Sequence, residues 1–126
     1  MNTLLVVDAA NVVGSVPDGW WRDRRGAAER LRDRLAGYAA AGSRALFADG
    51  PEVVLVVEGK ARGVAPVPGV RVEEASGSGD DAIVEVVAAR EPGRRCVVVT
   101  ADRELRARVT ALGAEVTGPS AVAVDA

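Results

Sequence analysis

Acidic side chains recur in this sequence directly after apolar runs or at the start of predicted helices. Asp8 follows the run Leu4–Val7, where burying a carboxylate is costly unless hydrogen bonds or a cation compensate its charge. Several carboxylates that converge on one place repel one another strongly unless a cation bridges them. Oxygen ligands of this kind suit hard divalent ions, so the pattern predicts a site for Mg²⁺ or Mn²⁺. The carboxylates concerned are Asp8, Asp80, Asp81, Glu85, Asp102 and Glu104.

The spacing of these carboxylates supports convergence. Asp81 and Glu85 are four residues apart, so they lie on one face of the helix predicted to follow the turn at 76–79. Asp102 and Glu104 flank one residue at a strand-to-helix turn, where both can approach one ion. Asp80 or Ser78 can cap the helix after the turn. Either Asp80 or Asp81 could be the ligand from this helix, and we prefer Asp81, because it pairs with Glu85 and leaves Asp80 as the cap.

The composition excludes several other chemistries. The chain has no histidine, which rules out histidine acid–base schemes, Ser–His–Asp and Cys–His catalysis, and zinc sites built from His and Cys. Its one cysteine, Cys96, opens an apolar run and reads as a buried strand residue, so no internal disulfide can form. The sequence shows neither a membrane-spanning run nor a signal peptide, and a cytoplasmic location is expected.

The elements that must position these residues alternate between strands and helices. Continuous apolar runs at Leu4–Val7, Val53–Val57 and Val97–Thr100 are typical of strands buried on both faces of a parallel sheet. Weaker strands are expected at 70–73 and 115–117, with a further edge at 121–124, and helices at 23–41, 80–90 and 103–112. This order predicts one α/β domain, a three-layer sandwich with a mostly parallel sheet of about five strands. Ligands of such sheets bind beyond the carboxyl ends of the strands, where the acidic residues lie.

Three segments resemble motifs of the NYN branch of the PIN-like nucleases, in the order in which that family carries them. They are VVDAANVVGS at 6–15, SGSGDDAIVEVV at 76–87 and VVTADREL at 98–105. The resemblance spans most of the chain, so residues 1–126 are interpreted as one NYN/PIN-like domain. It implies a metal-dependent ribonuclease with the strand order 3-2-1-4-5.

The same resemblance implies roles for individual residues. Asp8, Asp81 and Asp102 become metal ligands, and Glu85 and Glu104 become further ligands or hold metal-bound water. Asn11 either orients Asp8 or contacts a phosphate. The residue after the second strand, Glu58, stands where the family often carries Asp.

The expected partner is RNA, single-stranded or structured. Because the net charge is −2, a polyanion must bind through a local patch rather than through bulk charge. We expect one of two adjacent tryptophans to pack and the other to stack on an unpaired base, while nearby cations meet phosphates. The residues concerned are Asn11, Trp20, Trp21, Arg22, Arg24, Arg25 and Lys60.

Three other functions stay open. The segment VVLVVEGKAR at 53–62 resembles the first motif of Toprim domains, which are also Mg²⁺-dependent nucleic-acid enzymes. A catalytically inactive RNA-binding module and a nucleotide phosphohydrolase are the other two. Loss of Asp8 separates the first of these from the PIN-like reading, since a Toprim-like site does not use it. The oligomeric state, including a homo-oligomer, is left open by the sequence.

Overall fold

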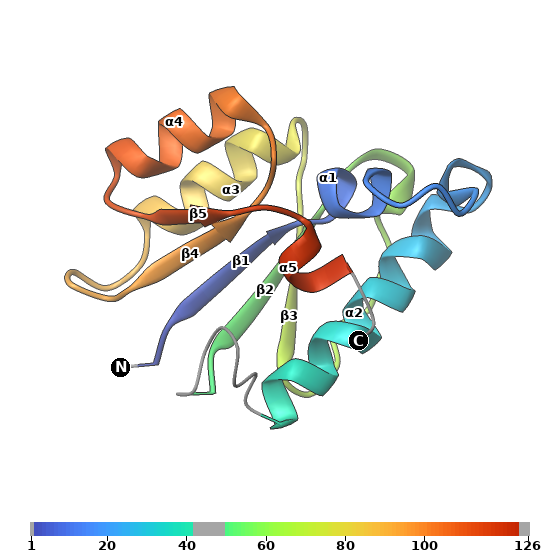
Figure 1. Ribbon diagram of the computed structural model, residues 1–126, viewed down its shortest axis with the longest axis horizontal. Coiled ribbons are helices and arrows are strands. Elements are labelled where there is room, and N and C mark those ends of the chain that lie inside the picture. Colours follow the sequence, from blue (N-terminus) through green and yellow to red (C-terminus); the bar gives the residue numbers. More distant parts are fainter. Residues whose placement is uncertain (1, 42–49, 124–126) are drawn as a thin grey trace.

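The computed structural model describes residues 2–41 and 50–123 and contains one five-stranded, all-parallel sheet. The strand order is β3-β2-β1-β4-β5, so the predicted fold class and strand order are both confirmed. Helices cover both faces of the sheet and complete the three layers (Figure 1). The strands are β1 (Leu4–Asp8), β2 (Glu52–Val57), β3 (Val70–Glu74), β4 (Cys96–Val99) and β5 (Glu115–Thr117).

The helices are α1 (Ala9–Gly14), α2 (Arg24–Ala41), α3 (Gly79–Ala88), α4 (Arg103–Ala111) and α5 (Ser120–Ala123), with short 3-10 helices η1 (Trp20–Arg22) and η2 (Gly59–Ala61). The helices predicted at 23–41, 80–90 and 103–112 are present as α2, α3 and α4, whereas the short helices α1 and α5 were not predicted. The edge strand expected at 121–124 is wrong, because α5 occupies this stretch and packs Val122 into the core. Val124 itself lies outside the described residues.

The core divides into two aliphatic clusters, one on each face of the sheet. Alternate residues of β1 point to opposite faces, with Leu5 and Val7 in one cluster and Leu4 and Val6 in the other. The first cluster includes buried residues of α1, α2 and α5, and the second includes residues of α3 and α4. Cys96 is buried in the second cluster, as expected for a strand residue. Burial on both faces explains why these strands read as unbroken apolar runs.

The register of the sheet sets the position of the predicted site. Val7 of β1 pairs with Val99 of β4, so the next residues, Asp8 and Thr100, lie side by side at the carboxyl edge. On the other side, Asp8 pairs with Val56 of β2, one position before the end of that strand. Because β1 is central, its carboxyl end lies between the turns that follow both neighbouring strands.

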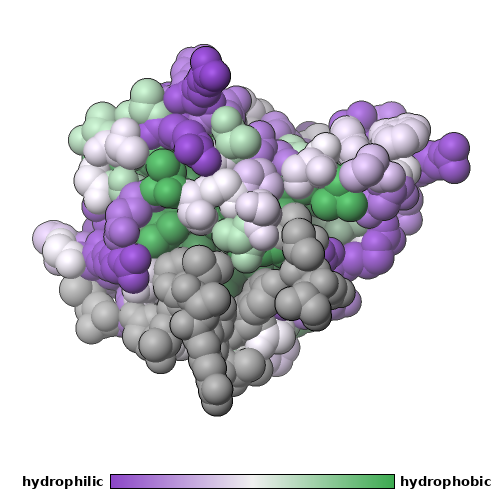
Figure 2. Space-filling view, in the orientation of Figure 1, coloured by the Kyte–Doolittle hydropathy of each residue, from purple (hydrophilic) through white to green (hydrophobic). Residues whose placement is uncertain are grey.

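The surface is hydrophilic mainly around its rim. In Figure 2, hydrophilic side chains gather at the right, over the connection between α1 and α2, and apolar residues show nearer the centre of this face. No helix within residues 2–41 and 50–123 is long and apolar enough to cross a membrane.

Candidate functional site

Asp8 is a buried carboxylate held at the end of the central strand, with an exposed fraction of 5%. The Thr100 hydroxyl donates to its Oδ2 at 2.9 Å, and the backbone N–H of Asn11 donates to its Oδ1 at 3.4 Å. Burial raises the pKa of Asp8 to about 6, the hydrogen bonds from Thr100 and Asn11 oppose the shift, and Asp80 and Glu58 add to it. The charge of Asp8 is therefore only partly compensated by its surroundings.

Two polar side chains tie the turn after β1 to the turn after β4. Asn11 Oδ1 accepts a hydrogen bond from the backbone N–H of Ala101 at 2.9 Å. The Thr100 hydroxyl, which is fully buried, also accepts from the backbone N–H of Asp102 at 3.1 Å. These bonds fix Asp8 and Asp102 relative to each other. The sequence predicted a site role for Asn11 but did not single out Thr100.

Asp80 joins this group from the first turn of α3. Its pKa is raised, first by burial and then by the negative charges of Asp102 and Glu58. Asp80 lies three and seven residues before Ile83 and Val87, the residues that α3 buries against the sheet. It therefore shares the inward face of the helix. That spacing was readable in the sequence and could have identified Asp80 as the residue that faces the site.

The structure places Asp81 and Glu85 away from the group around Asp8, so Asp80 rather than the preferred Asp81 is the aspartate of α3 that lies near this group. Asp81 is exposed and pairs with Arg108 of α4, Nη2 to Oδ1 at 2.9 Å. Ser78 caps α3 by accepting from the backbone N–H of Asp81 at 3.4 Å, so Asp80 is not required as a cap. Asp81 and Glu85 do share one helical face, but that face lines a separate hollow beside Ser76. The apolar residues of α3, rather than the carboxylate spacing, fix which face turns inward.

Asp102 and Glu104 lie at the start of α4. Asp102 is the N-cap of this helix, and its Oδ1 accepts from the backbone N–H of Leu105 at 2.9 Å. Glu104 is exposed in the first turn, and its negative charge adds to the raised pKa of Asp80. Both residues thus lie at the expected edge of the sheet, with Asp102 also performing a structural role.

Glu58 is a member of this group that the sequence did not assign to the site. Its Oε2 accepts a hydrogen bond from the backbone N–H of Gly79 at 2.9 Å, which anchors the start of α3 to the end of β2. A Cβ at Gly79 would lie 2.9 Å from Glu58 Oε1, too close for any side chain without movement. Glu58 also raises the pKa values of Asp8 and Asp80. Its position after a buried strand was the signal that could have revealed it.

The carboxylates converge at one edge without forming a closed cage. Within residues 2–41 and 50–123, no three acidic or cysteine side chains are close enough to enclose a metal ion by themselves. The donors present are all oxygens, and the pKa values of Asp8 and Asp80 are raised first by burial and further by neighbouring carboxylates, whose negative charge a cation would offset. This arrangement fits Mg²⁺, which commonly takes one or two carboxylates and completes its shell with water and substrate phosphate.

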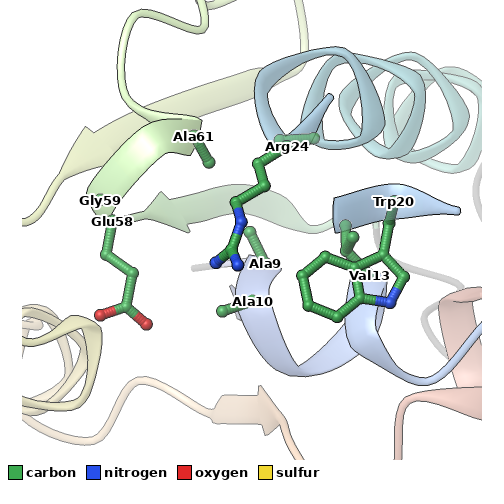
Figure 3. A pocket seen from close by; sticks show the side chains of 9 residues that line it. Ala9, Ala10, Val13, Trp20, Arg24, Glu58, Gly59 and Ala61 are labelled. Carbon is green, nitrogen blue, oxygen red and sulfur yellow. The ribbon is translucent and has the colours of Figure 1, made fainter. Parts of the chain in front are cut away.

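A pocket of about 220 Å³ opens beside the carboxylates (Figure 3). Its lining includes Ala9 and Ala10, which lie between Asp8 and Asn11, and also Glu58. The guanidinium of Arg24 stacks on the ring of Trp20 here, with its Cζ 5.1 Å from the ring centroid. The predicted substrate residues Trp20 and Arg24 are thus brought to the edge of the acidic group.

The other predicted substrate residues surround this pocket less closely. Trp21 is 54% exposed and meets Trp20 edge-on, with ring centroids 6.0 Å apart, and Arg22 stacks over its ring at 5.9 Å. Arg25 extends toward the loop at Gly63, and Lys60 is exposed on η2. One tryptophan is half-buried and the other exposed, as the sequence predicted. Trp20, the half-buried ring, is the one that lines the pocket.

Comparison with solved structures finds the same fold in Rae1 (YacP) from Bacillus subtilis. The W164L mutant of that protein matches with a TM-score of 0.71 and 19% identity, covering 95% of this chain and 71% of its own. A second structure of Rae1 matches with a TM-score of 0.68 and 20% identity, covering 93% and 69%. No family model and no curated protein matches the sequence. The likeness extends over nearly the whole chain and is a likeness of fold.

Proposed function

We propose that this chain is a metal-dependent nuclease that hydrolyses phosphodiester bonds in RNA. One observation carries the proposal: Asp8 is buried at the end of the central strand, and further carboxylates lie near it, so two hydrogen bonds compensate its charge only in part. A protein that needed Asp8 only for structure would gain by pairing it with a cation or by removing the neighbouring negative charges. The strand order and the three NYN-like segments add support from resemblance.

The proposed Mg²⁺ or Mn²⁺ ion binds at this edge through one or two of the carboxylates Asp8, Asp80 and Asp102, and water and the substrate phosphate complete its shell, with Glu104 at the outer edge. Asp80 takes the place that the sequence gave to Asp81, because Asp81 and Glu85 face a different hollow. Asp102 has one oxygen engaged in capping α4, which leaves the other for the ion. When bound, the metal would neutralise charge on the phosphate and lower the pKa of a water molecule.

The chain's own residues would hold and orient the reactants. Thr100 and Asn11 keep Asp8 in place, and Glu58 fixes the start of α3 and thereby Asp80. Arg24 and Lys60 would offset the negative charge of the phosphate. Trp21, Arg22 and Arg25 would contact the RNA strand farther from the cleaved bond. In the reaction, a water molecule loses a proton to solvent as its oxygen bonds to phosphorus, one bridging P–O bond breaks, and the leaving oxygen takes a proton from solvent. No histidine base is required.

The test is incubation with labelled single-stranded RNA, structured RNA and free nucleotides, each with Mn²⁺ and with EDTA. We expect RNA cleavage in Mn²⁺ and none in EDTA. Asp8→Asn is expected to reduce the rate by roughly 100- to 1,000-fold, as loss of a key electrostatic group does. Mn²⁺ should also raise the melting temperature of the parent protein but not of Asp8→Asn.

The matched control is Asp33→Asn, which removes an exposed carboxylate on α2. It should leave both cleavage and the melting response to Mn²⁺ unchanged. Cleavage by Asp8→Asn at the parent rate would refute the proposal and favour the Toprim-like alternative, which does not use Asp8. Hydrolysis of free nucleotides without cleavage of RNA would identify a nucleotide phosphohydrolase instead.

A further inference from the structure

The pocket beside the carboxylates is hollow because its lining residues are small. Ala9, Ala10 and Ala61 contribute only methyl groups, and Gly59 contributes no side chain. Trp20 closes one side with the face of its indole ring, and Figure 3 shows the guanidinium of Arg24 reaching between this ring and Glu58.

The size and character of the pocket restrict its occupant. Its volume of about 220 Å³ is below the ~300–1,000 Å³ of pockets that enclose drug-sized ligands. It suits one planar ring system rather than two. The walls are apolar except for Trp20, Arg24 and Glu58, and aromatic and guanidinium planes are the groups on which unpaired bases stack.

The position of the pocket connects it to the acidic edge. Ala9 and Ala10 directly follow Asp8 in the chain, and Glu58 both lines the pocket and accepts a hydrogen bond at 2.9 Å from the backbone N–H of Gly79, the residue before Asp80. A nucleotide with its base in the pocket therefore has its phosphate within reach of the carboxylates. Arg24 is exposed and joins none of the ion pairs between described residues, so its charge is available to that phosphate.

We propose that this pocket binds one unpaired nucleobase of single-stranded RNA against Trp20, next to the phosphodiester bond that is cleaved. The inference rests on the proposed nuclease function and specifies its substrate. The base takes the place of the Arg24 guanidinium on the Trp20 ring, and Arg24 turns to the adjoining phosphate. A base within a duplex is paired and stacked on both sides, so it enters only after extrusion, which costs free energy. Single-stranded RNA is accordingly the preferred substrate.

Tryptophan fluorescence tests this independently of cleavage. The chain has two tryptophans, so Trp21→Phe leaves Trp20 as the only fluorophore of this kind. We expect saturable quenching when this protein is titrated, in Mn²⁺, with a cleavage-resistant phosphorothioate hexanucleotide. The same oligonucleotide made fully abasic should not quench, because it offers no ring to stack on Trp20.

A second variant fills the pocket without removing any contact of Trp20. Ala10 is exposed on α1, so Ala10→Leu in the Trp21→Phe protein should fold normally and occupy the space for the base. We expect it to bind the hexanucleotide roughly 5- to 150-fold more weakly, the range for loss of one base–aromatic stack. The matched control is Ala107→Leu, an exposed alanine on α4 outside the pocket, which should bind like its parent.

Equal quenching by the abasic oligonucleotide, or parent-like binding by Ala10→Leu, would overturn the inference. Failure of the nuclease proposal looks different, because it appears as RNA cleavage that is absent or insensitive to Asp8→Asn. Base-dependent quenching in a protein that cleaves no RNA would support the base-binding pocket and contradict the proposed nuclease function. Cleavage that depends on Asp8, without base-dependent quenching, would support the nuclease function and contradict the base-binding pocket.

Discussion

The two ends of the sheet both gather charged side chains, but they differ in how far opposite charges offset the buried one. At the amino end, the largely buried guanidinium of Arg94 pairs with Glu52 at 2.9 Å and Glu91 at 3.3 Å. It also donates to the backbone carbonyl of Asn2 at 2.8 Å and to its side-chain oxygen at 2.7 Å. At the carboxyl end, buried Asp8 receives hydrogen bonds but faces further negative charges.

The difference separates a structural use of charge from a candidate functional one. The Arg94 cluster joins the starts of β1, β2 and β4, and opposite charges offset the cost of burying the guanidinium. The Asp8 group carries an electrostatic cost in the folded state that a bound cation would remove. Residues that raise the energy of the native fold are commonly kept for function. The predictions below test whether the two ends differ in this way.

The largest expected effect comes from two adjacent residues of α3. Asp80 faces the carboxylates, whereas Asp81 pairs with Arg108 on the outer side. Asp80→Asn should reduce RNA cleavage in Mn²⁺ by roughly 100- to 1,000-fold, and Asp81→Asn should leave the rate unchanged. Initial rates of the two purified variants decide the assignment. The reverse result would restore Asp81 as the ligand, and two active variants would remove α3 from the site.

The second effect is on stability as a function of pH. The pKa of Asp8 is raised in the folded state from 3.8 to about 6, so folding favours its protonated form. This contribution is fully present below about pH 4 and is lost as pH rises through 6, which amounts to about 3 kcal/mol at most. Urea unfolding in EDTA at intervals from pH 4 to 7 should therefore show the parent losing stability relative to Asp8→Asn. If the difference in free energy of unfolding between the two proteins does not change with pH, the surroundings of Asp8 compensate its charge. The two ends of the sheet would then not differ in this respect.

The smallest effect concerns the amino end of the sheet. Arg94→Ala should lower the free energy of unfolding by about 1–3 kcal/mol, because it removes a mostly buried cation from partly exposed partners. The rate of RNA cleavage by the folded protein should not change. Arg95→Ala is the neighbouring control, since Arg95 and its partner Glu115 are both about half exposed, and it should cost less. Loss of cleavage in folded Arg94→Ala would contradict a purely structural role.

The sequence by itself determined the fold class and the edge at which the site lies. Unbroken runs such as Leu4–Val7 predict strands buried on both faces, and their alternation with helices predicts a parallel sheet. Carboxylates after such strands must then meet at one edge, because all parallel strands end on the same side. These are local signals, carried by residues close together in the chain. The short helix α5 was predicted as a strand, because four residues are too few to show whether the apolar pattern has the period of a helix or of a strand.

Only the tertiary structure decided which carboxylates meet. The spacing of Asp80 from Ile83 and Val87 is present in the sequence, but it selects Asp80 over Asp81 only because these two apolar residues seat α3 on the sheet. Glu58 holds a backbone N–H from a residue 21 positions away, and Thr100 binds Asp8 across 92 positions. Such contacts arise from the packing of separate elements rather than from local spacing. A helix rotates each successive residue by about 100°, so one position moves a carboxylate from the centre of the acidic group to the surface.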